Sequence, residues 1–383
     1  MNRLREALAA PGLSSIAEIK RRSPSAGTLR PDADAGDLAA SFERAGASAI
    51  SVLVAPAFGG SVDDLRAARA RARIPLLAKG FFRSERQLAE LREAGADAVL
   101  LILRDLDDAT ATRLQSYARD LAMDALVEVH NADELSRAVR FGADPIGVNA
   151  RDLRTFHIDR QVQLELVAAS PRDRLIVAES GIATRAQAAA AELAGADAIL
   201  VGSTLMRAGE PGAALADLLA RPLVKTCGMT RREDVDAAVE AGADLIGFVL
   251  ADSPRHIDEP LPVPDTVLSV AVVVGDAPDA GTDLMQRYGQ ENGHRSRDGV
   301  LLRRGRPVAT VADLPWRGED AQHWKRAARL PGRVMLAGGL DPDNVGDAVR
   351  AVRPWCVDAV RGLEAEPGVK DHEKLRAFVK AVR

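Results

Sequence analysis

The sequence predicts an α/β protein built from repeated strand and helix units and divided into two domains. Short apolar runs alternate with helical patterns from Ser15 onward, and many of these helices close on Ala-Gly. At 383 residues the chain exceeds what one hydrophobic core usually serves. A new pattern of strand, turn and helix begins near Leu223, in "RPLVKTCGMTRREDVDAAVEAGADLIGF". We therefore expect two domains that meet close to residue 221.

Eight apolar runs in the first domain have the length of strands, and helices separate them. The helices follow a 3.6-residue Ala/Leu spacing, and their closing Gly suits a left-handed C-cap. Eight units in about 220 residues fit a (β/α)8 barrel better than an open doubly wound sheet, which usually has fewer strands and a Gly-rich dinucleotide turn. In chain order the predicted strands are 15–20, 49–54, 75–80, 98–103, 125–130, 145–150, 175–180 and 198–203.

Composition and charge narrow the classes of function. The chain has 51 basic and 55 acidic side chains and a formal net charge of -4, which argues against a nucleic-acid surface. No apolar run approaches the roughly 18 residues of a membrane span, and residues 1–15 lack the apolar core of a secretory signal. We therefore expect a cytoplasmic protein without nucleic-acid or membrane partners. The two cysteines, Cys227 and Cys356, cannot build a metal cage, and we expect neither a metal nor a disulfide.

Charged and polar residues follow the predicted strands at the carboxyl ends, where such barrels carry their chemistry. A charge inside an apolar strand is costly unless it faces a site or a partner. Any single one could be a surface charge at a strand end, but several at one rim indicate a site. The residues at these ends are Glu18, Lys20, Lys79, Glu128, Asn149, Arg151, Glu179, Ser180, Gly202 and Ser203.

The loops after the seventh and eighth strands read "ESGI" and "VGSTLM", and these loops usually form the phosphate site in this fold. Their small residues let backbone N–H groups approach an anion. A Gly in such a loop could also serve only the turn. The pattern favours a phosphorylated substrate.

Six stretches between residues 15 and 207 share one resemblance: "IAEIKRRSPSAG", "LREAGADAVLLI", "LVEVHNADEL", "IGVNARDLRTF", "ESGI" and "ADAILVGSTLM". Together they resemble indole-3-glycerol-phosphate synthase of tryptophan biosynthesis. The resemblance implies decarboxylative ring closure of 1-(2-carboxyphenylamino)-1-deoxyribulose 5-phosphate to indole-3-glycerol phosphate. It implies no metal and no organic cofactor.

The resemblance also implies roles for residues at the rim. Lys79 would be the general acid that protonates the substrate carbonyl as the ring closes. Glu128 and Lys20 would serve the proton transfers of dehydration, and Glu18 would set their charge state. One departure concerns Lys79-Gly80-Phe81, because the family usually carries Lys-Asp-Phe here and a carboxylate is therefore missing. The remaining roles are contacts to the anthranilate ring and carboxylate by Asn149, Arg151 and Ser180, and to the phosphate by Ser23, Gly181, Gly202 and Ser203.

The second half carries another resemblance, in "VKTCGMTRREDVDAAVEAGADLIGFVLADSPRHI", "VMLAGGLDPDNVGDAV" and "GLEAEPGVKDHEKLRAFVKAV". These stretches resemble the start and the end of phosphoribosylanthranilate isomerase. The resemblance implies two tandem (β/α)8 barrels, over residues 1–221 and 222–383, and Amadori isomerisation of N-(5-phosphoribosyl)anthranilate. Because roughly 160 residues are few for eight units, we expect a shortened second barrel in which elements could be missing. The stretch "YGQENGHRSRDGVLLRRGRP" would replace two strands and two helices.

Cys227 ends the first predicted strand of this half. A Cys in an apolar strand is often only a small buried hydrophobe, but the resemblance assigns Cys227 as the general base that takes the sugar C2 proton. The matching general acid, which protonates the ring oxygen, would be Asp313 in "VATVADLPWRGEDAQHW". Cys356 is expected in the core and His294 in a surface loop, unless "ENGH" is a remnant of the family's Gln-Leu-His-Gly strand end.

Binding residues follow from the same resemblance. Arg255 would hold the anthranilate carboxylate, and Gly338 and Gly339 would take the phosphate. Arg361 stands in Val-Arg-Gly where the family carries Ser-Ser-Gly, so it could clamp the phosphate or block the site.

Two classes of function remain open. The first is an enzyme for two consecutive steps of tryptophan synthesis, with an active synthase fused to a weak or dead isomerase barrel as its alternative. The second is a non-catalytic scaffold that binds phosphorylated ligands. Lys20, Lys79 and Glu128 argue against the scaffold, since binding alone needs no set of proton-transfer groups. The expected partners are small phosphorylated, anthranilate-derived substrates.

Overall fold

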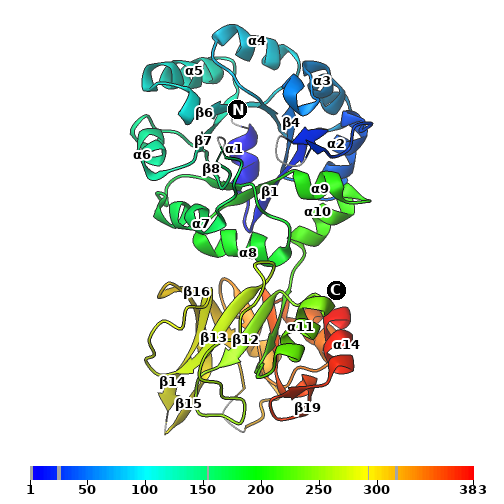
Figure 1. Cartoon of the computed structure of the whole chain (residues 1–383), viewed down its shortest axis with the longest axis vertical. Helices are drawn as coiled ribbons and strands as arrows, with labels where there is room; N and C mark the ends of the chain where they lie inside the picture. Colours follow the sequence, from blue (N-terminus) through cyan, green and yellow to red (C-terminus); the bar gives the residue numbers. More distant parts are fainter. Residues whose placement is uncertain (1–2, 24–26, 153–154, 292, 315–317) are drawn as a thin grey trace. The chain divides into compact units, whose positions relative to one another are not determined.

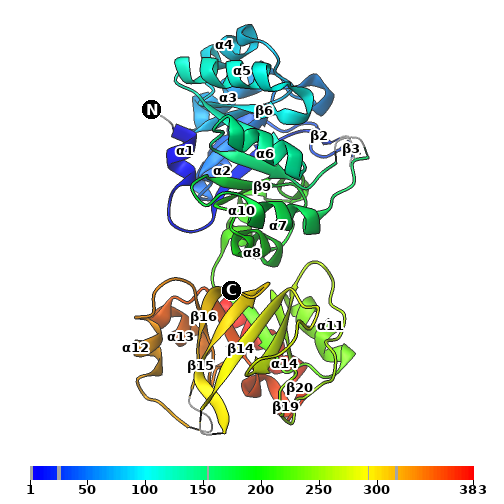
Figure 2. The same cartoon turned by 90° about the vertical axis from the view of Figure 1, so that its left-hand side faces the viewer.

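The computed structural model describes residues 3–23, 27–152, 155–291, 293–314 and 318–383. The chain divides into two compact units, Met1–Ala183 with Ala188–Leu219, and Thr184–Gln187 with Ala220–Arg383. Each unit contains one closed eight-stranded barrel, labelled along the chain in Figures 1 and 2. Two tandem barrels, the fold predicted from the sequence, are therefore confirmed.

The first barrel consists of eight parallel strands in the closed order β1-β10-β9-β8-β7-β6-β5-β4. Every predicted strand is present, because each apolar run is short enough for a strand and is followed by a segment with helical spacing. A small hairpin of β2 (Arg22–Ser23) and β3 (Gly27–Thr28) follows β1. The barrel strands are β1 (Ser14–Ile19), β4 (Ala49–Leu53), β5 (Leu76–Lys79), β6 (Ala98–Ile102), β7 (Asp124–Val129), β8 (Ile146–Asn149), β9 (Ile176–Glu179) and β10 (Ala198–Val201).

Helices surround this barrel, and Figure 1 shows them as an outer ring. Acidic or amide side chains cap several of them by accepting the exposed backbone N–H groups, as Asp107 and Asn131 do. Their apolar faces pack on the outside of the strands in one large core. The helices are α1 (Arg3–Leu8), α2 (Ala35–Arg44), η1 (Pro56–Phe58), α3 (Val62–Arg71), α4 (Glu85–Glu93), η2 (Leu103–Asp105), α5 (Asp108–Asp120), α6 (Ala132–Arg140), α7 (Arg160–Ala169), α8 (Arg185–Ala194), α9 (Ser203–Arg207) and α10 (Pro211–Leu219).

Strand register brings the predicted site residues to one rim of the first barrel. Lys79 pairs with Leu53, Glu128 with Ile102, and Asn149 with Glu179, each at the carboxyl end of its strand. Since all eight strands run the same way, these ends meet at the same side of the barrel.

The second barrel also closes with eight strands, but one of them runs against the others. β15 is antiparallel to both β14 and β16, whereas the other neighbours are parallel. Figure 2 shows β14, β15 and β16 side by side. The strands are β11 (Leu223–Cys227), β12 (Leu245–Val249), β13 (Leu268–Val274), β14 (Leu284–Glu291), β15 (His294–Arg303), β16 (Arg306–Ala312), β17 (Val334–Leu336) and β18 (Cys356–Ala359).

The expectation that residues 288–307 replace two strands is therefore wrong. These residues belong to two hairpins, and the strand count stays at eight. The second hairpin turns on Arg304 and Gly305, whose φ values of 48° and 74° are both positive, as a two-residue hairpin turn requires. Hairpins need no crossover helix, and no helix is described between Val249 and Ala312. The missing elements are helices.

The helices of the second unit come from the first and last parts of its sequence. The buried core of this unit includes Val224, Ile246, Phe248, Leu336 and Phe378. Across the described part of the chain, none of the helices is long and apolar enough to cross a membrane. Besides the barrel strands, this unit contains α11 (Arg232–Ala241), α12 (His323–Ala327), α13 (Val345–Val352), η3 (Arg361–Leu363), β19 (Glu364–Glu366), β20 (Val369–Lys370) and α14 (His372–Val382).

Candidate active sites

A buried cluster of acids and lysines stands at the rim of the first barrel. Lys79 Nζ lies 2.5 Å from Glu179 Oε2, 3.5 Å from Glu18 Oε2 and 3.6 Å from Glu128 Oε2. Lys20 Nζ lies 2.6 Å from Glu18 Oε1. The three glutamates are at most 3% exposed. Four predicted catalytic residues, Glu18, Lys20, Lys79 and Glu128, thus belong to one connected cluster, in which Lys79 contacts the glutamates and Lys20 contacts Glu18.

For Lys79, Glu18 and Glu128, the opposite charges of their neighbours affect the pKa more than burial does, so the charged form is favoured. Burial opposes the charge of Lys79, but Glu179, Glu18 and Glu128 raise the pKa of Lys79 above its ordinary value. Burial likewise opposes ionisation of Glu128, yet Lys79 and neighbouring donors lower the pKa of Glu128 to about 2. For Glu179, burial and the adjacent Glu128 carboxylate raise the pKa. The cluster therefore holds a charged lysine between carboxylates with different proton affinities.

Asn149 ends β8 beside this cluster, and Arg151 lies two residues further along the chain. Asn149 is 7% exposed, and its Oδ1 accepts the backbone N–H of Arg151 at 2.9 Å. The guanidinium of Arg151 donates to the carbonyl oxygen of Phe156 at 3.3 Å, which ties it to the loop after β8. Both residues lie on the rim that carries Lys79, as the sequence predicts.

The five small residues predicted for ring and phosphate contacts lie on three strand ends. Ser23 is buried in the β2–β3 hairpin. Ser180 and Gly181 follow β9 with φ values of 69° and 72°, and Gly202 and Ser203 follow β10 at the start of α9. Gly202 also makes room for the acid cluster, because a Cβ there would lie 2.4 Å from Glu18 Oε1.

Gly80, which stands where the family carries Asp, lies close to the ring of Phe82. A Cβ built on Gly80 would lie 2.8 Å from Cζ of Phe82. The Phe82 ring is 8% exposed and belongs to the core of the first unit. An aspartate at position 80 would therefore require this ring to move.

Two residues of this site carried no role in the sequence analysis. Glu179, which the sequence places at the rim without a catalytic role, makes the shortest contact to Lys79. His130 follows β7, and its Nε2 lies 3.2 Å from Glu128 Oε1. A charged or titratable residue at the end of an apolar strand, the signal that identified Lys79, was present for both.

In the second unit, Cys227 ends β11 and is 2% exposed. A Cβ on Gly247 would lie 2.4 Å from Cys227 Sγ and 3.0 Å from Lys225 Cε, so the thiol and this lysine stem converge there. Lys225 Nζ is 2.9 Å from Asp358 Oδ2 and fully buried. Burial raises the pKa of the Cys227 thiol, while the Lys225 ammonium works in the opposite direction.

Asp313 follows β16 and contacts the side chains of Tyr288 and Arg295. The Tyr288 hydroxyl donates to Asp313 Oδ2 at 2.8 Å, and Arg295 Nη2 lies 3.1 Å from the same oxygen. Burial raises the pKa of Asp313, although Arg295 counteracts it. Gln286 Nε2 donates to the Tyr288 hydroxyl at 2.7 Å. β14 contains Gln286-Arg287-Tyr288-Gly289. This stretch has the Gln and the Gly of the family's Gln-Leu-His-Gly strand end, with Tyr288 at the position of the His.

His294 is not in a loop: it begins β15, opposite Glu291, with an exposed side chain. Its strand belongs to the β14–β15 hairpin. Cys356 is fully buried in β18, as expected of a core residue.

The residues predicted to bind substrate in the second unit differ in their contacts and exposure. Arg255 donates to both oxygens of Glu364, at 2.8 and 2.6 Å, so its guanidinium is already paired. Gly338 and Gly339 adopt positive φ values of 88° and 70°, and a Cβ on Gly338 would lie 2.9 Å from Asp313 Oδ1. Arg361 begins η3 with an exposed side chain. Residues 315–317 of the loop after Asp313 lie outside the described residues.

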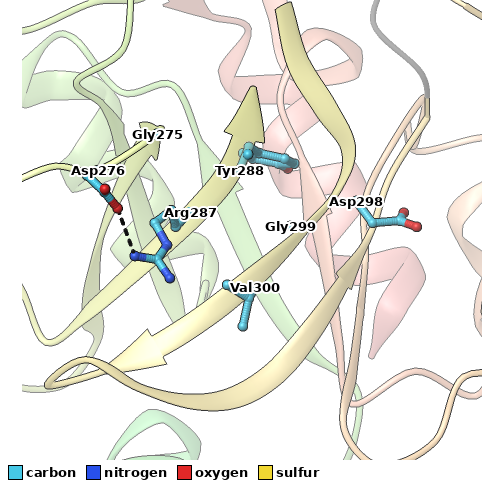
Figure 3. Close-up of a pocket in the computed structure, with 8 residues that line it drawn as sticks. Gly275, Asp276, Arg287, Tyr288, Asp298, Gly299 and Val300 are labelled. Carbon is cyan, nitrogen blue, oxygen red and sulfur yellow. Dashed lines mark hydrogen bonds and ion pairs between the residues drawn. The ribbon is translucent and has the colours of Figure 1, made fainter. Parts of the chain in front are cut away.

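Two cavities lie close to these clusters. The first, of about 430 Å³, borders the rim of the first barrel and is lined in part by His130, Glu134 and Asn149. The second, of about 440 Å³, lies along β14 and β15, and Figure 3 shows Arg287 reaching Asp276 across it at 3.5 Å. Neither Cys227 nor Asp313 lines the second cavity.

Among the described residues, no group of three or more His, Cys, Asp or Glu is arranged to hold a metal ion.

Closed barrels with buried acids, bases and cations at strand ends define the class of barrel enzymes that perform acid–base chemistry on small molecules. Residues 1–218 match the family described as indole-3-glycerol phosphate synthase, and the chain belongs to this family. Residues 320–381 match the family described as N-(5'-phosphoribosyl)anthranilate isomerase.

The chain is also similar to individual relatives and solved structures. The multifunctional tryptophan biosynthesis protein of Schizosaccharomyces pombe is 31% identical over 96% of this chain, and the chain spans 59% of that protein's length. Indole-3-glycerol phosphate synthase 2 of Streptomyces coelicolor is 47% identical, over 56% of this chain and 83% of its own. The crystal structure of TrpF from Jonesia denitrificans is 31% identical with a TM-score of 0.35, covering 43% of this chain and 97% of that one.

Proposed function

We propose that the chain catalyses two consecutive steps of tryptophan biosynthesis in the cytoplasm, with one reaction in each barrel. Residues 1–221 would close 1-(2-carboxyphenylamino)-1-deoxyribulose 5-phosphate to indole-3-glycerol phosphate, releasing carbon dioxide and water. Residues 222–383 would isomerise N-(5-phosphoribosyl)anthranilate to the substrate of the first barrel. The observation that carries the proposal is Lys79, held charged between Glu18, Glu128 and Glu179.

In the synthase reaction, Lys79 donates a proton to the carbonyl oxygen that the aromatic carbon attacks. Glu128 and Lys20 then transfer the protons of dehydration, and Glu18 fixes Lys20 through its 2.6 Å ion pair. Glu179 aims the Lys79 ammonium. Asn149, Arg151 and Ser180 hold the anthranilate ring and carboxylate, and Ser23, Gly181, Gly202 and Ser203 hold the phosphate.

In the isomerase reaction, Cys227 takes the proton from sugar C2 and Asp313 protonates the ring oxygen as the ring opens. Lys225 stabilises the thiolate, since its ammonium favours the charged form of Cys227. Arg255 binds the anthranilate carboxylate, while Gly338, Gly339 and Arg361 bind the phosphate.

A synthase fused to a weak or inactive isomerase is the second candidate. The observation in its favour is that Arg255 is paired with Glu364 at 2.6 Å, and Asp313 with Arg295 at 3.1 Å. Substrate would have to displace Glu364 to reach both guanidinium donors. Steady-state assays of both reactions on the purified chain decide between the candidates, because the second predicts synthase turnover alone.

Arg361 provides a specific test of the phosphate site. If Arg361 binds the phosphate, its charge-assisted hydrogen bonds should contribute about 1.5 to 3 kcal/mol. Arg361→Ala should therefore raise KM for phosphoribosylanthranilate by about 10- to 100-fold. Arg376→Ala, at an exposed position on α14, is the matched control and should leave KM unchanged. An Arg361→Ala enzyme with the wild-type KM would remove Arg361 from the phosphate site.

The proposed domain boundary predicts how the two fragments behave. Residues 1–221 contain a complete barrel with its ring of helices, so this fragment should be soluble and should retain synthase activity. Residues 222–383 should be the less stable fragment, because no helix is described from Val249 to Ala312 to cover those strands. Circular dichroism melts and synthase assays check both statements. An insoluble first fragment beside a robust second one would contradict the boundary.

A further inference from the structure

His130 is placed between two carboxylates at the edge of the synthase cluster. It directly follows β7, two positions after Glu128, and its side chain is 10% exposed. Nε2 lies 3.2 Å from Glu128 Oε1, and Nδ1 lies 3.0 Å from Glu134 Oε2. A neutral imidazole has one N–H, whereas here each ring nitrogen faces an acceptor. Nδ1 is within hydrogen-bond distance of Glu134, whereas Nε2 lies at ion-pair distance from Glu128 but outside hydrogen-bond geometry. A ring flanked by two carboxylates in this way matches an imidazolium.

Glu134, the outer partner of His130, is itself fixed by the start of α6. Its Oε2 also accepts the backbone N–H of His130 at 2.8 Å, and its Oε1 accepts Asn131 Nδ2 at 2.9 Å. Asn131 Oδ1 in turn accepts the backbone N–H of Glu134 at 2.9 Å, as an N-cap. The ring is consequently held by a rigid helix terminus on one side and faces Glu128 on the other.

We infer that His130 is a positioning residue of the synthase site, whose imidazolium keeps Glu128 ionised and orients it for proton transfer. The two oxygens of Glu128 face different cations, since Oε1 is near His130 and Oε2 is 3.6 Å from Lys79. A cation at ion-pair distance from each oxygen favours the ionised form of the carboxylate. This inference rests on the proposed synthase function.

The charges around Glu128 support this role. Burial and the Glu128 carboxylate raise the pKa of Glu179, so Glu18 and Glu128 are the carboxylates that the nearby ammonium groups of Lys20 and Lys79 keep ionised. An imidazolium at His130 supplies a further positive charge beside the carboxylate that is farthest from Lys79. Glu134, its counter-charge, lies in the first turn of α6, where the helix dipole favours an anion.

The titration behaviour agrees with the geometry. Burial opposes protonation of His130, but its bonds to Glu128 and Glu134 raise the pKa of His130 to about 9. Burial also opposes ionisation of Glu128, yet Lys79 and His130 lower the pKa of Glu128 to about 2. Other charged or titratable groups line the cavity that His130 borders: Arg104 from η2, and Asp152, His157 and Asp159 from the segment after β8.

Two variants separate the charge of His130 from its packing. His130→Gln keeps a neutral N–H donor but removes the positive charge, so the pKa of Glu128 should rise. Because Glu128 must be ionised to accept a proton, the acid limb of the synthase kcat/KM profile should move to higher pH by about one unit or more. Glu134→Gln should leave the acid limb near the wild-type position, since His130 is still protonated in acid.

Ring NMR of the ligand-free chain supplies a measurement that does not depend on activity. The chain has six histidines, and the His130→Gln spectrum identifies the missing resonance. In wild type this ring should carry two protons at pH 7.5 and titrate near pH 9. In Glu134→Gln its titration should fall by about one unit or more, because one of the two carboxylates has lost its charge. Thermal melts confirm that both variants are folded.

The outcomes are distinguishable. An active wild type with a neutral His130 ring at pH 7.5, or a His130→Gln enzyme with an unshifted acid limb, overturns the inference and leaves the proposed function standing. A wild type without synthase activity at any pH overturns the proposed function, and the role of His130 falls with it.

Discussion

Lys79→Met should lower the synthase kcat by about 100-fold or more, the usual range for a general acid or base, while KM changes little. In the proposed mechanism the ammonium of Lys79 donates to the substrate carbonyl, and methionine of similar length cannot donate. The substitution also removes the cation that contacts Glu18, Glu128 and Glu179. Their pKa values should therefore rise, and the remaining activity should shift its optimum upward in pH.

The control for Lys79→Met is Lys325→Met, which removes an exposed lysine of α12 and should leave the synthase rate unchanged. Isomerase turnover of the Lys79→Met chain should match wild type, since Cys227 and Asp313 belong to the other barrel. A Lys79→Met enzyme that retains a near wild-type synthase kcat would remove Lys79 from the general-acid role.

Cys227→Ser should abolish most isomerase turnover, by about 100-fold or more, because a hydroxyl is a far weaker base than a thiol at neutral pH. Burial already raises the pKa of Cys227, so in the proposed mechanism the Lys225 ammonium is needed to favour the thiolate. Steady-state isomerisation of phosphoribosylanthranilate measures the effect. Synthase turnover on the same protein is the internal control and should not change.

Asp313→Asn is the companion test, since its amide cannot donate a proton as a carboxylic acid does. Burial raises the pKa of Asp313, which favours the protonated form that an acid needs. A wild type that isomerises rapidly while both Cys227→Ser and Asp313→Asn remain unaffected would mean that the catalytic pair lies elsewhere.

Much of the first barrel could be predicted because its signals are local. Each of its strands is a short apolar run, each is followed by a helical pattern, and charges such as Lys79 and Glu128 interrupt the runs where the strands end. Parallel order then brings these ends to one rim, so strand order accounts for the shared position of Lys79 and Glu128. The contact of Glu179 with Lys79 could not be predicted in this way, because it depends on side-chain reach across the barrel.

The reversed strand of the second barrel could not be predicted from residue pattern, since alternation of apolar residues does not encode strand direction. Direction here depends on the connections on either side of β15. The turn at Arg304 and Gly305 needs positive φ at both residues, and Arg-Gly is a weaker signal for this geometry than Asn-Gly. For the same reason the position of Tyr288 beside Asp313 became visible only in the folded chain.

The most direct test of the two-site account supplies the purified chain with phosphoribosylanthranilate alone and follows the formation of indole-3-glycerol phosphate. Wild type should form it, Cys227→Ser should leave the starting material unconverted, and Lys79→Met should accumulate 1-(2-carboxyphenylamino)-1-deoxyribulose 5-phosphate. A wild-type chain that converts this intermediate when it is supplied, but leaves phosphoribosylanthranilate unchanged, would contradict an active second barrel.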